Sequence, residues 1–338
     1  MDRPGIAGYG LSLPTRRLSA RGIARQFGIP ESVVREKQGL DGKHVSAPRE
    51  MPTEMALVAA RRAIAHARTQ GVDPRDIGLV AWVGSQWKDY HVWLASAYLQ
   101  DRLRLRGAFA FDLSAMCTGM VFGLSLAKRF LSADDDLRAV LLVGASKESY
   151  LVRASDPRSR WMDNFADGGV AVVVARDLPR RRILGSAFRS DGSLALAAVE
   201  RGGGARFPTT AAYVRAGQAY LENRMPEDRF RRRIGAVSLP NFVATIRRSV
   251  ESSRLSLSEV RLLLLNHMKW SFHREILEGV GIPPDRSVYL REYGHTQSAD
   301  QILGLDLALR SGRFAHGPVV LAAAGTGYVW GSVVVEWG

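Results

Sequence analysis

Short apolar runs of the length of a buried strand recur along this chain, separated by segments of helical periodicity. Buried strands typically span about four to eight residues, whereas helices are longer. The runs that fit this description are residues 77–84, 139–144, 170–175, 260–265, 319–324 and 332–336. Between residues 54 and 68, apolar side chains recur on one helical face, opposite Arg62 and His66. This alternation predicts an α/β fold in which helices cover a central sheet.

The second half of the chain repeats the order of elements in the first half. Segments 76–87 and 259–270 are each an apolar strand that leads to a polar residue and a tryptophan. Segments 138–146 and 318–326 are each a strand-like run, followed later by a small-residue turn and a valine-rich strand. A repeat of this size indicates a duplicated α/β domain rather than a solenoid. The expected halves are 1–177 and 178–338.

The composition is that of a globular chain with an excess of basic residues. The 338 residues carry a net charge of +14 and a single cysteine, which excludes an intramolecular disulfide and a thiolate zinc cluster. No apolar run approaches the roughly 20 residues of a membrane helix, and residues 1–18 lack a secretion-signal pattern. We therefore expect a cytoplasmic protein with no membrane association. The basic residues are mostly scattered and form no nucleic-acid motif, so no nucleic-acid partner is expected.

The single cysteine, Cys117, lies at the junction between a strand and a helix. An apolar strand ends near Asp112, and a helical pattern runs from Thr118 to Phe130. The dipole of a helix N-terminus favours a thiolate, and Gly119 allows the backbone to pack closely. A lone cysteine is also often a small buried hydrophobe. The spacing fits both interpretations of Cys117, a nucleophile and a buried core residue.

Two histidines and a glycine-rich turn occupy positions where α/β folds commonly build sites. His267 follows the strand 260–265, and His295 lies among small polar residues before a helical pattern over 302–310. Residues at the carboxyl end of a strand face the side of the sheet where ligands usually bind. The turn 323–328 can direct backbone N–H groups toward an oxyanion. Each histidine is also compatible with a purely structural, hydrogen-bonded role.

Taken in order, these segments resemble the condensing enzymes of the thiolase superfamily, and most of all the β-ketoacyl-acyl-carrier-protein synthase III group. The resemblance extends over nearly the whole chain. The motifs that carry it are the nucleophile segment 112–119, the turn 164–169, the pair Asn266 and His267, the segment 293–296 and the turn 325–331. The resemblance implies the thiolase fold, a duplicated five-layered α-β-α-β-α architecture.

The resemblance also implies roles for individual residues. Cys117 would accept the acyl group from a thioester, with His267 and His295 as its catalytic partners. The backbone N–H groups of the oxyanion hole would come from Cys117, Thr326 and Gly327. Substrate contacts would come from Trp87, Tyr90, Met116 and Asn266. A homodimer is implied, in which the loop carrying Trp87 and Tyr90 reaches the partner's acyl pocket, and neither a metal nor a redox cofactor is needed.

His295 departs from the family pattern, where an asparagine is typical. A neutral imidazole can still donate one hydrogen bond to an enolate, as decarboxylative Claisen condensation with a malonyl-type thioester requires. Such a condensation, in lipid or polyketide and other secondary-metabolite biosynthesis, is the leading expectation. The alternative is an acyltransferase that moves the acyl group to a hydroxyl or amine without decarboxylation, with a histidine as base. A third possibility, a catalytically silent partner of another condensing enzyme, does not explain why Cys117 is retained.

Residues 33–39 also differ from many relatives, which carry there a tryptophan and an Arg-Thr-Gly that clamp the adenine of coenzyme A. With the net charge of +14, this difference favours an acidic acyl carrier protein over free coenzyme A as the donor. Gln86 lies near the position where a related synthase has a glutamate that acts in an aldol step. Glutamine cannot titrate, so that reaction is not expected.

Overall fold

The computed structural model describes residues 4–216 and 219–338. The expected halves, 1–177 and 178–338, include residues 1–3 and 217–218, which lie outside the described ranges, and their division stays a prediction. The larger strands are β1 (Gly5–Ser12), β4 (Ile77–Trp82), β5 (Phe109–Asp112), β6 (Ala139–Ser146), β7 (Gly168–Ala175), β8 (Arg182–Ser190), β11 (Leu262–Leu265), β12 (Gly317–Gly325) and β13 (Val329–Trp337). In the described residues they are hydrogen-bonded in the order β11-β12-β13-β8-β1-β7-β6-β4-β5.

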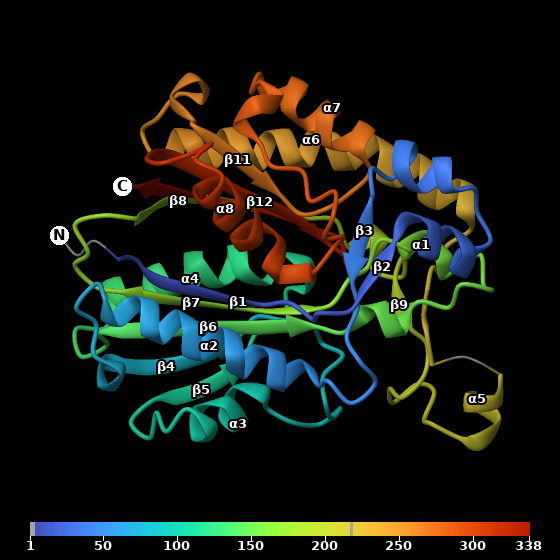
Figure 1. Ribbon diagram of the computed structural model, residues 1–338, viewed down its shortest axis with the longest axis horizontal. Helices are drawn as coiled ribbons and strands as arrows, with labels where there is room; N and C mark the ends of the chain where they lie inside the picture. Colours follow the sequence, from blue (N-terminus) through green and yellow to red (C-terminus); the bar gives the residue numbers. More distant parts are fainter. Residues whose placement is uncertain (1–3, 217–218) are drawn as a thin grey trace.

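Helices and strands are stacked in five layers (Figure 1). The first layer contains α2 (Pro52–Arg68) and α3 (Ala95–Arg102), which pack on β1 and β4–β7. The middle layer contains α4 (Gly119–Ala133) and α8 (Asp300–Arg310). Strands β8 and β11–β13 follow, and α6 (Glu227–Ser252) and α7 (Trp270–Val280) cover them on the outside. The expected α-β-α-β-α architecture is confirmed.

Strand pairing supports a duplication. In the first half, β6 pairs in parallel with β4 and antiparallel with β7, and β7 pairs antiparallel with β1. In the second half, β12 pairs in parallel with β11 and antiparallel with β13, and β13 pairs antiparallel with β8. The two sets of strands meet where Gly5 of β1 pairs with Arg182 of β8. The same succession of parallel and antiparallel pairings therefore occurs twice.

All the apolar runs predicted as strands overlap strands, and the predicted helix 54–68 corresponds to α2. β1 was not predicted because glycines interrupt its apolar pattern and lower its strand propensity. One of them, Gly10, allows β1 and α2 to pack backbone to backbone, because a Cβ there would lie 2.2 Å from the carbonyl oxygen of Ala59. α6 was also missed, since it is largely polar and contains Pro240, which is unfavourable inside a helix.

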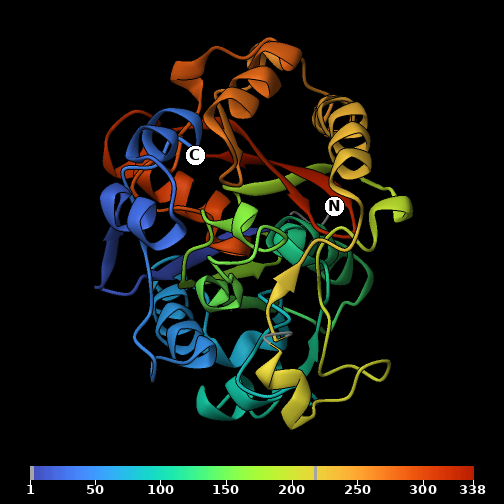
Figure 2. The ribbon, with the colours of Figure 1, turned by 90° about the vertical axis from the view of Figure 1, so that its right-hand side faces the viewer.

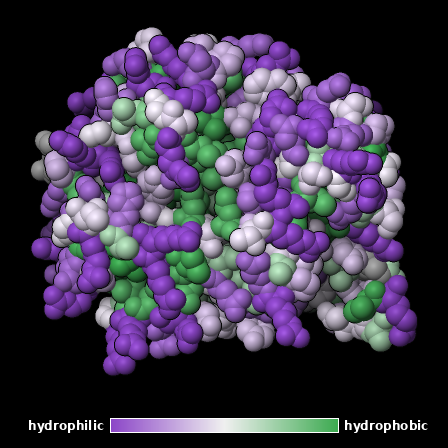
Figure 3. Space-filling model, viewed as in Figure 1, coloured by the Kyte–Doolittle hydropathy of each residue, from purple (hydrophilic) through white to green (hydrophobic). Residues whose placement is uncertain are grey.

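The shorter elements gather at one end of the layers, the end that faces the viewer in Figure 2. They are β2 (Arg17–Ser19), β3 (Gly42–His44), β9 (Val199–Glu200), β10 (Leu221–Glu222), α1 (Ala20–Phe27) and α5 (Ala211–Arg215). On the face drawn in Figure 3, hydrophilic side chains cover most of the surface, and apolar residues gather in its hollowed centre. Within the described ranges, none of the helices is both long enough and apolar enough to span a bilayer.

Candidate active site

Cys117 lies in a 3-10 turn, Met116–Thr118, between the end of β5 and the start of α4. Met116 adopts the left-handed backbone conformation, with φ 47°, which costs a non-glycine residue about 1 kcal/mol or more. Gly119 lets α4 begin directly against the chain that leaves β4, because a Cβ there would lie 2.1 Å from the carbonyl oxygen of Val83. The predicted strand-to-helix junction is confirmed. The thiol is buried at the N-terminal end of α4, where the helix dipole favours a negative charge.

Cys117, His295 and Asp300 form a continuous chain of polar contacts. Nε2 of His295 lies 3.1 Å from Sγ of Cys117, and Nδ1 of His295 lies 2.6 Å from Oδ2 of Asp300. All three side chains are buried. Burial alone would lower the pKa of His295, but the charges of Asp300 and Cys117 and the hydrogen bonds to both raise this pKa well above its ordinary value. The geometry favours an imidazolium at His295, which in turn favours a thiolate at Cys117.

Asp300 also fixes the backbone around both histidines. Its Oδ2 accepts a hydrogen bond from the backbone N–H of His267 at 2.7 Å, and its Oδ1 accepts one from the backbone N–H of Thr296 at 2.7 Å. The carboxylate therefore binds three donors from two segments that are distant in sequence. Sequence reasoning missed this residue. The available signal was an acidic side chain at the start of the predicted helix after His295, where it suits the helix dipole.

Asn164 holds His267 in the tautomer that leaves Nε2 protonated. The Nδ2 group of Asn164 lies 3.1 Å from Nδ1 of His267, which must therefore accept, so the ring proton is on Nε2. Nε2 is buried and has no hydrogen-bond partner among the described residues. Burial lowers the pKa of His267 to about 3, although the charge of Asp300 opposes this shift. His267 is thus a neutral ring with one free donor.

Two cavities meet at the sulfur of Cys117. The first, called here the His267 cavity, has a volume of about 350 Å³ and is lined by Cys117, His267 and His295. The second, called the Met116 cavity, has a volume of about 300 Å³ and is lined by Met116, Cys117 and Trp87. Thr326 lines both. A thiol with space on two sides can hold a covalently bound group in one cavity while a second reactant enters by the other.

The predicted substrate-binding residues are divided between these cavities. Trp87 and Met116 line the Met116 cavity, and Asn266 lines the His267 cavity. Tyr90 lines neither: its side chain is 68% exposed, and its ring packs edge-on against Trp93. Within a single chain, the structure therefore does not bring Tyr90 to the site.

The glycine-rich turn that was predicted to contribute to the oxyanion hole lies against the nucleophile. A Cβ on Gly325 would come within 3.1 Å of the backbone nitrogen of Cys117, so the turn and the Cys117 segment are in close contact. Thr326 and Gly327 follow, and both line the Met116 cavity. Asn266 supports the turn, because its Oδ1 accepts a hydrogen bond from the backbone N–H of Ala324 at 3.0 Å. Cys117, Thr326 and Gly327 thus line the same cavity, and their role as an oxyanion hole stays a prediction.

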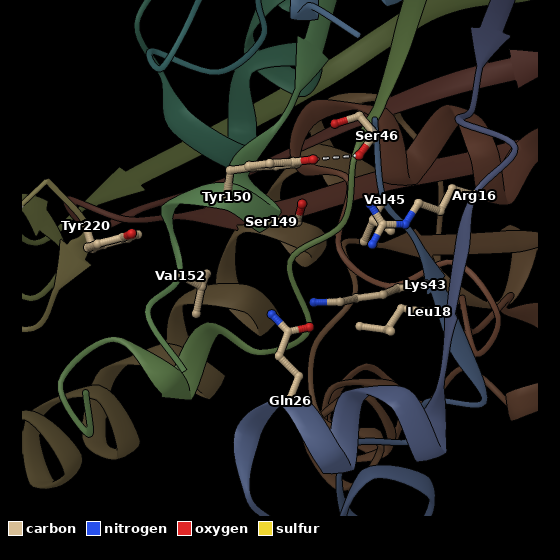
Figure 4. A pocket seen from close by; sticks show the side chains of 10 residues that line it. All are labelled: Arg16, Leu18, Gln26, Lys43, Val45, Ser46, Ser149, Tyr150, Val152 and Tyr220. Atoms are coloured by element: carbon tan, nitrogen blue, oxygen red, sulfur yellow. Dashed lines mark hydrogen bonds between the residues drawn. The ribbon is translucent and has the colours of Figure 1, made fainter. Parts of the chain in front are cut away.

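A third cavity, of about 390 Å³, lies away from the sulfur (Figure 4). Arg16 and Lys43 give it a cationic lining, and Tyr150 on the opposite wall donates a hydrogen bond to the carbonyl oxygen of Ser46 at 2.9 Å. Burial lowers the pKa of Lys43 to about 8, against the charges of Asp163 and Asp167. This cavity shares no lining residue with the two at Cys117, so the reacting groups are assigned to those two.

Comparison with known proteins agrees with this architecture. Residues 111–192 match the family model of 3-oxoacyl-[acyl-carrier-protein] synthase III, and residues 250–337 match the model of its C-terminal part, which together make up half of the chain. A β-ketoacyl-[acyl-carrier-protein] synthase III from Symbiobacterium thermophilum is 29% identical over 336 residues, covering 99% of this chain and 98% of that protein. A 3-oxopimeloyl-[acyl-carrier-protein] synthase from Rhodothermus marinus is 27% identical, covering 99% and 94%.

A solved structure gives the same result. The crystal structure of 3-oxoacyl-(acyl carrier protein) synthase III from Pseudomonas aeruginosa superimposes with a TM-score of 0.83 at 25% identity, covering 99% of this chain and 98% of that one. The agreement includes both halves of the fold and the segments that carry Cys117, His267 and His295. The chain therefore belongs to the 3-oxoacyl-[acyl-carrier-protein] synthase III family of thiolase-fold condensing enzymes.

Proposed function

We propose that this condensing enzyme works through an acyl-Cys117 intermediate, which it uses in a decarboxylative Claisen condensation with a malonyl-type thioester. The observation that carries the proposal is the buried contact between Cys117 and His295, with the free donor of His267 lining the same cavity. A thiolate supplies the nucleophile, and the two histidines supply donors for the charge that develops on the second substrate. The products would enter lipid, polyketide or other secondary-metabolite biosynthesis.

In the first half-reaction, the Cys117 thiolate attacks the carbonyl carbon of the donor thioester. Backbone N–H groups of Cys117, Thr326 and Gly327 stabilise the oxyanion, and each such donor contributes about 3 kcal/mol. The carbon–sulfur bond to the carrier then breaks. The carrier sulfur takes the proton from Nε2 of His295 and leaves as a thiol, which leaves His295 neutral.

In the second half-reaction, the malonyl-type thioester enters through the His267 cavity and loses carbon dioxide. Nε2–H of His267 donates to the thioester oxygen of the resulting enolate. His295 can donate there only after Nε2 regains a proton, because in the neutral ring the proton is on Nδ1, against Asp300. The enolate carbon attacks the acyl carbonyl, the new carbon–carbon bond forms, and Cys117 leaves as a thiolate.

The contact between His295 and Asp300 also favours a second candidate, acyl transfer to a hydroxyl or an amine without decarboxylation. A neutral His295 whose Nδ1–H is held by a carboxylate presents a lone pair at Nε2, the arrangement of a general base. That base would take a proton from the acceptor as its oxygen or nitrogen attacks the acyl group. The two candidates thus require opposite protonation states of the same nitrogen.

The experiment that separates them follows the acyl-enzyme to product with a malonyl thioester whose free carboxyl is isotopically labelled. Condensation predicts release of labelled carbon dioxide in a one-to-one ratio with product. Product formed from a hydroxyl or amine acceptor without such release would instead establish transfer. His295→Asn separates the candidates further, because asparagine keeps a donor but removes the base. From preformed acyl-enzyme, condensation should then persist, whereas transfer should fall by about 100-fold or more. Loading of Cys117 should be slower but should still occur, because asparagine cannot protonate the carrier sulfur.

We also propose an acyl carrier protein as the donor-side partner. Lys269 is exposed and lines the His267 cavity, so a cation is close to a point of substrate entry. The segment without the adenine clamp forms a short π-helix, Val33–Lys37, in which the Val34 side chain is buried and cannot stack on a base.

The expected location is the cytoplasm, because its reducing conditions suit a protein whose catalytic thiol must stay reduced.

A homodimer is the expected assembly. β5 is the last strand of the sheet, so one of its edges is available for pairing, and Phe109 on this strand is 52% exposed. An unpaired edge strand with an exposed aromatic side chain is a common place for association with a second copy. The loop with Trp87 and Tyr90 would then lie near the partner. Sedimentation that shows a monomer at micromolar concentration would contradict this assembly.

A further inference from the structure

Glu148 and Gln297 lie side by side on the lining of the Met116 cavity and form what is called here its polar wall. Glu148 follows β6 and is buried beside the cavity. Its Oε1 accepts two hydrogen bonds, from Oγ of Ser85 at 2.6 Å and from Nε2 of Gln297 at 2.7 Å. Both hydrogen bonds that the described residues give this carboxyl go to Oε1. The second oxygen, Oε2, is left for a group in the cavity.

Gln297 provides an independent observation. Because its Nε2 donates to Glu148, its Oε1 is fixed as an acceptor, and this oxygen is buried with no hydrogen-bond partner in the described part of the chain. The residue also adopts the left-handed conformation, with φ 58°, which is unfavourable for a non-glycine side chain. Backbone strain of this kind is typically stored where a side chain is held for a function. A buried acceptor without a donor is costly unless a ligand supplies the donor.

The charged groups around Glu148 and Gln297 also favour a ligand that donates hydrogen bonds. Burial raises the pKa of Glu148, opposed by the hydrogen bond from Ser85, the charge of His295 and the hydrogen bond from Gln297. A second carboxyl, that of Glu200, lines the same cavity. Among the described residues that line it, none is a lysine or an arginine. The cavity therefore offers acceptor oxygens and carboxyls, and the carboxyl of Glu200 lies in the field of His91, the histidine on its lining.

We propose that the acyl group carried by Cys117 bears a hydrogen-bond-donating substituent, a hydroxyl or an amine, which binds Gln297 Oε1 and Glu148 Oε2 in the Met116 cavity. This inference rests on the proposed acyl-Cys117 intermediate and adds the chemical class of the acyl chain. A neutral primary amine has two N–H donors and can bind Gln297 Oε1 and an ionised Glu148 together. A hydroxyl has one donor, so it can donate to Gln297 and accept a hydrogen bond from Glu148 when that carboxyl is protonated. A plain alkyl chain would leave both oxygens unpaired, and a carboxylate would be repelled by the carboxyls.

The test is a set of N-acetylcysteamine thioesters of one chain length, followed by rapid quench and intact-protein mass spectrometry. The set contains pentanoate and derivatives with a hydroxyl or an amino group at each carbon in turn, together with a terminally carboxylated chain. The wild-type protein should load at least one hydroxyl- or amino-bearing chain about 10-fold faster than pentanoate, and the carboxylated chain slowest. Comparing the loading rates of the hydroxylated and the aminated chains shows which of the two substituents binds better to Glu148 and Gln297.

Two variants test the wall itself. Glu148→Gln keeps the shape but turns an amide N–H toward the cavity, and Gln297→Met keeps the length but removes the acceptor. Each should lower the ratio of donor-bearing to plain-chain loading by about 10-fold. Glu275→Gln, the same change at an exposed position of α7, is the matched control and should leave the ratio as it is in the wild type.

The outcomes are distinct. Equal or faster loading of pentanoate in the wild type, or an unchanged ratio in both variants, would overturn the inference and leave the acyl-Cys117 proposal intact. If no chain of the set loads Cys117, the proposed function fails, and the inference that rests on it fails too.

Discussion

Oδ2 of Asp300 lies 2.6 Å from Nδ1 of His295, on the side of the imidazole opposite the sulfur of Cys117. The same oxygen binds the backbone N–H of His267. One carboxylate therefore orients both histidines and sets the proton affinity of one of them. This arrangement gives His295 a property that the asparagine expected here from the resemblance would not have, because asparagine cannot change its charge.

We predict that Asp300→Asn slows loading of Cys117 by about 10- to 100-fold. Without the carboxylate charge, the pKa of His295 falls and the thiolate of Cys117 is less favoured. The amide must also turn an N–H group toward one of the three donors that Asp300 now binds, which should cost about 1–3 kcal/mol of folding free energy. Quenched-flow loading rates and urea unfolding measure the two effects separately.

Asp306→Asn is the control for this prediction. Asp306 lies on the same helix, α8, and accepts a hydrogen bond from the hydroxyl of Tyr9 at 3.1 Å, away from both cavities at Cys117. Asparagine can keep that hydrogen bond, so loading should match the wild type. A loading rate for Asp300→Asn equal to that of the control would contradict the role assigned to Asp300.

The two candidate reactions should respond to pH in opposite directions. Condensation from the acyl-enzyme uses His295 with a proton on Nε2, so its rate should fall as the pH rises through the pKa of His295. The charge of Asp300 still raises this pKa once Cys117 is acylated, whereas the charge of Cys117 no longer does. Transfer to a hydroxyl or amine uses the neutral ring, so its rate should rise over the same interval. His267 stays neutral above its pKa of about 3 and adds no slope near neutral pH. Single-turnover rates from preformed acyl-enzyme measure this, and a flat profile would show that the protonation of His295 controls neither reaction.

Loading from an acyl carrier protein should weaken steeply with salt, by roughly 10-fold or more between low and high ionic strength. At physiological ionic strength, dissolved salt screens the attraction between exposed charges beyond about 8 Å. α6 carries a run of three arginines at residues 231–233. Two of them, Arg231 and Arg232, already form exposed ion pairs with Glu227 and Asp228, and such pairs are weak enough to be exchanged for pairs with an acidic carrier protein. The same acyl chain on coenzyme A is the control. Equal or better loading from coenzyme A, insensitive to salt, would contradict a carrier protein as donor.

The fold could be predicted largely from local patterns, because the buried strands, both parallel and antiparallel, are continuous apolar runs and α2 has a clear apolar face. The positions of Cys117 and His267 were also within reach, since both follow strands directly, and such positions are common in sites. β1 escaped prediction because its glycines serve close packing against α2, which local propensity does not register.

The partners of the candidate catalytic residues were harder to predict, because they depend on contacts between distant segments. Asn164 and His267 are 103 residues apart, yet the tautomer of His267 depends on their contact. Glu148 and Gln297 are 149 residues apart, and neither has a local pattern that indicates the other. Asp300 is close to His295 in sequence, but its second role, at the backbone of His267, becomes visible only in the folded chain.

The central claim is that Cys117 carries the acyl group, and intact-protein mass spectrometry of the quenched reaction tests it most directly. With a thioester donor alone, the wild-type protein should gain the mass of one acyl group, peptide mapping should locate it on Cys117, and the second substrate should remove it as product appears. Cys117→Ala should gain no mass and form no product. An acyl group on another residue, or product formed by Cys117→Ala at the wild-type rate, would contradict the account.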